Sequence, residues 1–408
     1  MKYNKWTVAL AALGVVSFAS AAKAEEKASP VMTALSGTTI SGYVDTSAEW
    51  NPGTGNANLP PYKFDSTRKA DGFNLDVIQL RIDKPLDEQD WAAGYRADFW
   101  FGPDANTLGT SSLGVNNSDF GIRQAYVALR APVGTGLDLK MGVFDSIIGY
   151  ESIESGNNPN FTRSYGHSIE PQTETGLLAS YRFCDCLSAS AGVADTFGPA
   201  INDRAFAPFN AAAYSPQTES ESYKTYMGSI ALTAPDSMGF LSGSTLYAGV
   251  VNGFDDVPHG NLAKPLTVTS YYLGATVATP VTGLRVGASF DYLDLHPINN
   301  DTYSLAGYLS YQATEKLSFH ARAEYFKDKL ADAGGTFLAF GNTGAGNGAT
   351  VMGLTGTVQY DLWKNVISRF EVRWDHSLGG NDLFGADANG DPNQKNAVML
   401  AANVIYKF

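Results

Sequence analysis

Residues 150–172, YESIESGNNPNFTRSYGHSIEPQ, bring together in one polar stretch several kinds of side chain that interact with dissolved ions and solutes. Acidic, basic and aromatic groups lie close together here, and those that we single out are Glu151, Glu154, Arg163, Tyr165, His167 and Glu170. In a narrow opening, opposed charges create a transverse field and a size limit, which is how rings of charge select solutes. The alternative is an ordinary surface loop whose charges are solvated.

Basic side chains recur in the polar phase of alternating segments elsewhere in the chain. They are Arg96, Arg130, Lys140, Arg182, Arg285, Arg322, Arg369 and Arg373. Acidic residues in the same phase are fewer, which predicts a basic wall that lines a pore opposite the acidic stretch 150–172. The alternative is mutual neutralisation, because Arg322 and Glu324 lie two residues apart on one face.

Strands must position these residues. From residue 38 onward the chain resolves into about sixteen alternating segments of about ten residues, the length of a tilted membrane-spanning strand. In VISRFEVRWDH, for example, Phe370, Val372 and Trp374 share one face and charged residues the other. The second segment, FNLDVIQLRI, changes phase midway, which requires a bulge. The segments begin near Thr38, Phe73, Trp91, Phe120, Leu137, Thr173, Leu187, Tyr223, Gly243, Thr267, Leu284, Thr302, Leu317, Thr350, Val366 and Asn396.

The connections between these segments alternate in length. Short ones such as PVGTG, CDC, PVTG and ATEK are interleaved with longer polar ones at 51–72, 102–119, 150–172, 196–222, 254–266, 296–301, 328–349 and 377–395. A soluble sandwich has no reason to sort its loops in this way, whereas an outer-membrane barrel has short periplasmic turns and longer extracellular loops. The sequence therefore predicts an all-β fold, a transmembrane antiparallel up-and-down β-barrel with an even number of strands.

The first residues predict export. Lys2 and Lys5 precede a short uncharged apolar run that ends in an Ala-x-Ala site at Ala22 and Ala24, the pattern of a cleavable signal peptide. The run is shorter than the roughly 20 residues of a membrane-spanning helix. We therefore expect a signal peptide at 1–24, a short periplasmic segment at 25–37 and a barrel at 38–408.

The last residues, VMLAANVIYKF, form an alternating strand that ends on an aromatic residue. An open sheet edge in lipid would leave backbone groups unsatisfied, so this strand must pair with the first one. A terminal aromatic residue on such a strand also resembles the signal that barrel-assembly machinery reads. Tyr406 and Phe408 are therefore the predicted closure and assembly signal.

The stretch from ISGYVDTSAEWN through GFNLDVIQLRIDKP and GYRADFWFGPDAN to IRQAYVALRAP resembles the OmpL-like beta-barrel porin family. So do LDLKMGVFDSIIGYESIES, NNPNFTRSYGHSIEPQTETG and the final strand, and the resemblance is sharpest from Ile40 to Phe183. It implies an outer-membrane diffusion channel and brings no catalytic motif. In general porins of sixteen strands, the loop after the fifth strand narrows the lumen, and here that loop is 150–172.

Other chemistry finds little support in the sequence. The His-x-Ser spacing of outer-membrane phospholipases is absent, and ADANGDPN lacks the glutamate that completes an EF-hand. Walker, dinucleotide-binding and zinc patterns are also absent, so we expect no enzymatic activity, cofactor or metal. Cys184 and Cys186 either form a tight disulfide, which export permits, or serve as two small residues at a turn.

The sequence thus predicts an outer-membrane porin for passive diffusion of small hydrophilic solutes and ions. Alternatives are a sugar-selective channel, in which Trp100, Tyr150 and Tyr165 form a stacking track, and a non-conducting structural or adhesive barrel plugged by its loops. Expected partners are outer-membrane lipid, barrel-assembly machinery, the other subunits of a homotrimer and small solutes, but not nucleic acid. Ion preference stays open, because the net charge of −13 suggests cations and the basic wall suggests anions.

Overall fold

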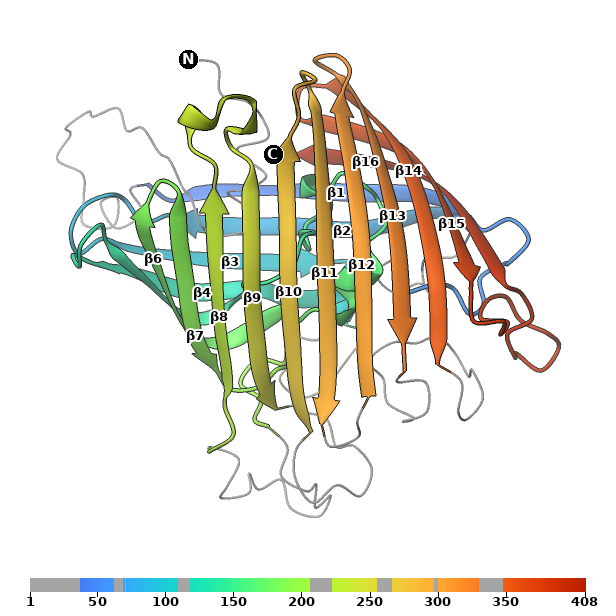
Figure 1. The fold of residues 1–408 in the computed structure, drawn as a ribbon, viewed down its shortest axis with the longest axis horizontal. Coiled ribbons are helices and arrows are strands. Elements are labelled where there is room, and N and C mark those ends of the chain that lie inside the picture. Colours follow the sequence, from blue (N-terminus) through green and yellow to red (C-terminus); the bar gives the residue numbers. More distant parts are fainter. Residues whose placement is uncertain are drawn as a thin grey trace.

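The chain folds into a closed barrel of antiparallel strands, β1 to β16 (Figure 1). The computed structural model describes residues 37–61, 69, 71–108, 118–205, 222–254, 266–296, 300–329 and 348–408. Each strand pairs with its neighbours in the chain, and β1 pairs with β16 to complete the circle. The predicted signal peptide at 1–24 lies outside the described residues, as does nearly all of segment 25–37.

The predicted strands are confirmed, with each start within two residues of its expected place. Short helical segments lie in the connections: η1 (Pro103–Thr107), η2 (Ser155–Asn157), α3 (Tyr165–Ile169) and η4 (Asp236–Leu241). The strands are β1 (Thr39–Trp50), β2 (Gly72–Lys84), β3 (Ala93–Phe101), β4 (Phe120–Ala131), β5 (Leu137–Asp145), β6 (Thr173–Cys184), β7 (Leu187–Ala194), β8 (Thr225–Thr233), β9 (Thr245–Phe254), β10 (Thr267–Ala278), β11 (Leu284–His296), β12 (Asn300–Gln312), β13 (Leu317–Asp328), β14 (Ala349–Trp363), β15 (Val366–Ser377) and β16 (Asn396–Lys407).

The two faces of the barrel are sorted as in a membrane protein. In β15, Phe370 is 52% exposed on the outer face, whereas Glu371 and Arg373 are buried on the inner face. A soluble β-sandwich would place the apolar positions inside and the charged ones outside. Apolar residues outside and polar residues inside are the arrangement of a barrel that faces lipid.

Two bulges change which residues point into the lumen. In β2, Val77 pairs with Asp45 and Leu75 with Thr46, so Asp76 is the extra residue. In β4, Gln124 pairs with Asp98 and Ile122 with Phe99, so Arg123 is the extra residue. The first bulge explains the phase change seen in the sequence of β2. Both extra side chains, Asp76 and Arg123, are buried.

The closing seam, where β1 meets β16, involves the last residue. The Gly42 N–H donates to the Phe408 carbonyl, and the Phe408 N–H donates to the Gly42 carbonyl, each at 3.0 Å. The side chains of Tyr406 and Phe408 are about half exposed on the outer face. The seam leaves no open strand edge, as a strand surrounded by lipid requires.

The strand connections differ at the two ends of the barrel. Figure 1 shows compact turns at the end where β1 begins and β16 ends, and we refer to this end as the turn end and to the other as the loop end. In the turn between β6 and β7, Cys184 and Cys186 are joined by a disulfide. Among the described residues, no helix is long and apolar enough to cross a membrane.

The closing seam predicts a position-specific effect of adding one methyl group. A Cβ on Gly42 would lie 2.7 Å from Phe408 Cζ and closer still to the Gln79 carbonyl oxygen, whereas a Cβ on Gly307, also on the outer face, would meet nothing within 4 Å. Gly42→Ala should therefore destabilise the barrel by about 1–3 kcal/mol, the range for overpacking. The measurement is the temperature at which the folded band is lost in heat-modifiability electrophoresis. An equal shift for the control Gly307→Ala would contradict this account.

Candidate functional site

The connection between β5 and β6, residues 146–172, folds into the barrel. Its helix α3 contacts β11, β12 and β13, and the Ser164 side chain caps the helix by accepting from the His167 N–H at 3.1 Å. Ile148 and Ile169 pack into an apolar cluster with Leu178 and Phe326 of the wall. The stretch 150–172 is therefore an internal element of the lumen and not the solvated surface loop considered as the alternative.

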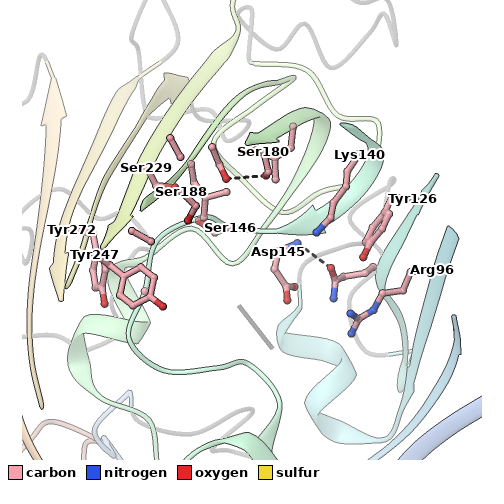
Figure 2. Close-up of a pocket in the computed structure, with 17 residues that line it drawn as sticks. Arg96, Tyr126, Lys140, Asp145, Ser146, Ser180, Ser188, Ser229, Tyr247 and Tyr272 are labelled. Atoms are coloured by element: carbon pink, nitrogen blue, oxygen red, sulfur yellow. Dashed lines mark hydrogen bonds between the residues drawn. The ribbon is translucent and has the colours of Figure 1, made fainter. Parts of the chain in front are cut away.

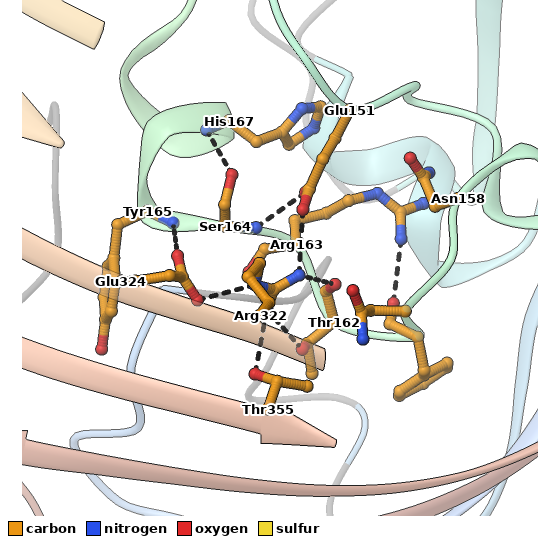
Figure 3. A network of polar contacts seen from close by, with 12 residues as sticks. Glu151, Asn158, Thr162, Arg163, Ser164, Tyr165, His167, Arg322, Glu324 and Thr355 are labelled. Carbon is orange, nitrogen blue, oxygen red and sulfur yellow. Dashed lines mark hydrogen bonds and ion pairs between the residues drawn. The ribbon is translucent and has the colours of Figure 1, made fainter. Parts of the chain in front are cut away.

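Arg322 of β13 anchors this loop to one wall (Figure 3). Its guanidinium lies 2.9 Å from Glu151 Oε1 of the loop and 2.7 Å from Glu324 Oε2 of its own strand. It also donates to the Thr162 carbonyl at 2.8 Å and the Arg163 carbonyl at 3.1 Å. Because Arg322 is almost fully buried, this one side chain satisfies loop carbonyls and carboxylates that water cannot reach.

Residues of β15 extend the same anchor. Arg373 Nη1 donates to the Arg163 carbonyl at 2.7 Å, and its Nε lies 2.9 Å from Asp375 Oδ2. The Tyr165 hydroxyl donates to Asp375 Oδ1 at 2.7 Å. Glu371 accepts from the Thr162 N–H at 2.9 Å and from the Thr162 hydroxyl at 2.6 Å. The loop is thus bonded to β13 and β15 through both side chains and backbone.

Glu154 anchors the loop to the wall on the other side. Its carboxylate contacts Arg81 of β2, Arg96 of β3 at 3.4 Å and Arg123 of β4 at 3.5 Å. The same three arginines surround Asp98, with Arg81 at 2.8 Å and Arg96 at 2.8 Å. The loop therefore crosses the lumen and is held on both sides. Removing one partner of such buried ion pairs typically costs 3–5 kcal/mol.

Two predicted residues of the loop are buried by different contacts, because Arg163 bonds within the loop whereas Tyr165 packs against the barrel wall. Arg163 donates to the Phe161 carbonyl at 2.9 Å and to the Ile153 carbonyl at 3.0 Å. The Tyr165 ring stacks on Phe326 at a centroid distance of 4.9 Å and is fully buried. Both side chains hold the fold of the loop and present no face to open space.

His167 and Glu170 are buried together near the end of the loop, with His167 Nδ1 3.8 Å from Glu170 Oε2. Burial, together with the nearby Arg163 and Arg322 guanidinium groups, lowers the pKa of His167 to about 3. Burial also raises the pKa of Glu170 well above its usual range, with Asp291 and Glu151 adding to the rise. His167 is therefore neutral at physiological pH.

The predicted basic wall is wrong for three residues. Arg322, Arg369 and Arg373 do take the inward phase, but each is less than 5% exposed because the loop covers it. Arg369, like the other two, bonds to loop carbonyls, in its case those of Ser155 at 3.1 Å and Asn158 at 2.7 Å. These three guanidinium groups hold the loop in place and do not line open space.

The other predicted basic residues lie nearer the turn end. Arg130 pairs with Asp138 at 2.6 Å, and Arg182 pairs with Asp185 at 2.6 Å. Arg285 is half-buried at an inward position of β11. Arg96 and Lys140 line the space that the loop leaves open.

That open space is a small cavity between the start of the loop and the wall from β3 to β10, and we refer to it as the narrow passage (Figure 2). Tyr247 and Tyr272 lie on one side of it, across from Arg96 and Tyr126. The remaining lining residues include Lys140, Asp145, Ser146, Ser180, Ser188, Ser190 and Ser229.

The narrow passage continues into a wider vestibule toward the turn end. Arg96, Tyr126, Lys140 and Ser180 line both cavities, which shows that they adjoin. The passage offers about 80 Å³ to the centres of water molecules, against about 470 Å³ in the vestibule. A single water needs roughly 10–15 Å³ on this measure, so the passage holds several waters.

Sequence reasoning missed several residues of the site. Arg81 and Arg123 escaped because the bulges in β2 and β4 shift the inward phase, and only the broken alternation of FNLDVIQLRI signalled one of them. The search for pore-lining residues considered mainly charged side chains. It therefore missed Tyr247, Tyr272 and the serines that line the passage. Within the described part of the chain, no group of three or more His, Cys, Asp or Glu is placed to hold a metal ion.

A closed sixteen-stranded barrel with a loop folded into a polar lumen defines the class of outer-membrane porins. The family model described as "Putative beta-barrel porin-2, OmpL-like" matches residues 37–408, and the chain belongs to this family. It is an outer-membrane porin. A comparison with curated proteins found no match.

Solved structures with a similar fold share little sequence. OprB of Pseudomonas putida, in its high-pH structure, superposes with a TM-score of 0.60 at 11% identity, covering 93% of this chain and 96% of that one. The anion-selective porin from Comamonas acidovorans gives 0.56 at 11% identity, covering 91% and 99%. OmpT of Vibrio cholerae, in a trimer form, gives 0.54 at 11% identity, again covering 91% and 99%.

The anchoring network predicts that Arg322→Gln loosens the loop. The change leaves Glu151 without its cation and Glu324 with the more distant Arg373 at 3.5 Å, and it should destabilise the folded barrel by about 3–5 kcal/mol. The matched control is Arg182→Gln, since that arginine pairs with Asp185 at an exposed turn, where such pairs contribute about 0–1 kcal/mol. Heat-modifiability and limited proteolysis within 146–172 are the readouts. Similar effects of the two changes would disprove the anchoring role.

Because the pKa of His167 is lowered in the folded protein, the barrel should become less stable toward unfolding as the pH decreases. Between pH 6.5 and pH 5 the unfolded chain takes up a proton that the folded chain does not, which costs roughly 2 kcal/mol. Heat-modifiability of wild type should decline over this window more steeply than that of His167→Gln, which has no such proton to take up. Both proteins retain Glu170, so its opposite contribution cancels in the comparison. Parallel pH profiles would show that the imidazole is not excluded from water.

Proposed function

We propose that this porin conducts small hydrophilic solutes and ions by passive diffusion through the narrow passage beside the loop. The observation that carries the proposal is the placement of the loop. It is bonded to β13 and β15 through Arg322 and Arg373 and to β2, β3 and β4 through Glu154. These bonds fix the loop across the lumen, and space remains along the wall from β3 to β10, where hydroxyl and charged groups can replace water around a solute.

A sugar-selective channel finds less support. Of the three aromatic residues expected to form a stacking track, Trp100 and Tyr165 are about 1% exposed or less. The Tyr150 ring stacks on Tyr308 at a centroid distance of 4.0 Å. Trp100 and Tyr165 therefore cannot offer a ring face to a sugar, and Tyr150 has one of its two faces covered. The family and fold likewise favour a channel over an enzyme.

A plugged surface barrel remains the second candidate because of one specific observation. Such a barrel should have lumen arginines paired with acidic residues of the loop, and Arg322 with Glu151 and Arg123 with Glu154 are pairs of that kind. The passage and vestibule argue for conduction instead. Only a conductance measurement distinguishes the two.

The oligomeric state of the protein and its orientation in the outer membrane are proposed by analogy with similar porins. We propose a homotrimer, supported by the trimer form of the similar OmpT structure, with the termini and the turn end in the periplasm. Export by a signal peptide at 1–24 and recognition of Tyr406 and Phe408 by the assembly machinery belong to the same proposal. Loss of the 1–24 segment from the protein isolated from outer membranes, read by N-terminal sequencing, would support the cleavage site.

The refolded protein in a planar bilayer should show stable single-channel steps. Ser229 lines the passage, so a negatively charged methanethiosulfonate reagent on Ser229→Cys should reduce the conductance by roughly half or more. Ser304→Cys is the matched control, because Ser304 also points inward but is fully buried beneath α3. The native cysteines are joined in a disulfide and do not compete for the reagent. Folded protein that inserts without conducting would establish the plugged barrel.

A further inference from the structure

One wall of the lumen is built from strands without side chains that are charged at neutral pH. The four consecutive strands β7, β8, β9 and β10 contain no Asp, Glu, Lys, Arg or His. Where they border the narrow passage, they present hydroxyl groups and small side chains, with Ser188, Ser190, Ser229, Tyr247 and Tyr272 among them. The electric field in the passage must therefore come from the opposite side.

On that opposite side, most charges are already neutralised. Arg96 lies 2.8 Å from Asp98 and 3.4 Å from Glu154. Asp145 is bound by Arg123 at 2.7 Å. Closely paired charges of opposite sign largely cancel each other at the distance of a passing solute.

Lys140 differs from these groups. Its Nζ lies 5.0 Å from the centre of the Tyr126 ring, and among the described residues it forms no ion pair, since Asp83 of the vestibule interacts with it only beyond 4.0 Å. The ring holds the ammonium group in place by a cation–π contact without cancelling its charge. Lys140 lines both the narrow passage and the vestibule, so every solute that uses this route passes it.

We propose that Lys140 makes the narrow passage selective for small hydroxylated organic anions, such as sugar acids. The ammonium group attracts the carboxylate, while the serine hydroxyls of β6 to β8 exchange hydrogen bonds with the hydroxylated body. This proposal rests on the proposed function, because it requires an open passage. It predicts anion preference despite the net charge of −13, since charges on the outer surfaces are screened beyond a Debye length of about 8 Å.

The first test is the reversal potential of the single channel in a tenfold potassium chloride gradient. Wild type should show a potential of the sign for chloride permeation, and Lys140→Gln should lose at least about half of it, because the side chain keeps its length but not its charge. The matched control is Lys316→Gln, a lysine that also lies over a tyrosine ring, Tyr360 at 5.9 Å, but in the turn between β12 and β13. This control should keep the wild-type potential.

The second test separates charge from size. Gluconate added at millimolar concentration should reduce the chloride current of wild type, whereas sorbitol, a neutral polyol of the same carbon number, should not. In Lys140→Gln the effect of gluconate should fall to that of sorbitol. Equal effects of gluconate and sorbitol on wild type would overturn the proposal.

The possible failures are distinguishable. Channels that conduct but prefer cations, or whose reversal potential is unchanged in Lys140→Gln, would overturn the role of Lys140 and leave the porin function standing. Folded protein that never conducts would remove the proposed function and this inference with it.

Discussion

The requirement that every backbone N–H and C=O in lipid find a partner governs this structure. A single chain meets it here by pairing β1 with β16, down to the reciprocal bonds between Gly42 and Phe408. Once the sheet is closed, alternate residues must face either lipid or lumen. Polar residues therefore collect inside, where a second structural problem arises, because so many charged groups at close quarters need partners.

The loop between β5 and β6 solves that problem. Its backbone and carboxylates are bound by Arg322, Arg369 and Arg373 on one side, while its Glu154 meets Arg81, Arg96 and Arg123 on the other. Burying ions is costly, and the arrangement is tolerable because each guanidinium has several partners. These ion pairs hold the loop rigidly across the lumen. The open space therefore lies to one side, against strands that carry few charges. An uncharged wall lets a single unneutralised lysine dominate the field there.

Local alternation allowed much of the architecture to be predicted. The strands, their number and the pairing of the ends follow from a period of two and from sorted loop lengths, which any barrel in lipid must show. The loop that enters the lumen was expected only from the resemblance to general porins. The bulges at Asp76 and Arg123 were harder to place, because an extra residue reverses the inward phase for the rest of a strand. Arg81 and Arg123 were missed for this reason.

The sequence by itself determined that this chain forms a barrel and which face of most strands is polar, since both depend on neighbouring residues. Only the tertiary structure decided which inward charges meet water. Arg373 and Lys140 carry the same charge in the same phase, yet the loop covers Arg373 and leaves Lys140 beside the passage. That difference depends on contacts between residues more than 150 positions apart, such as Arg322 with Glu151, and no local pattern records them.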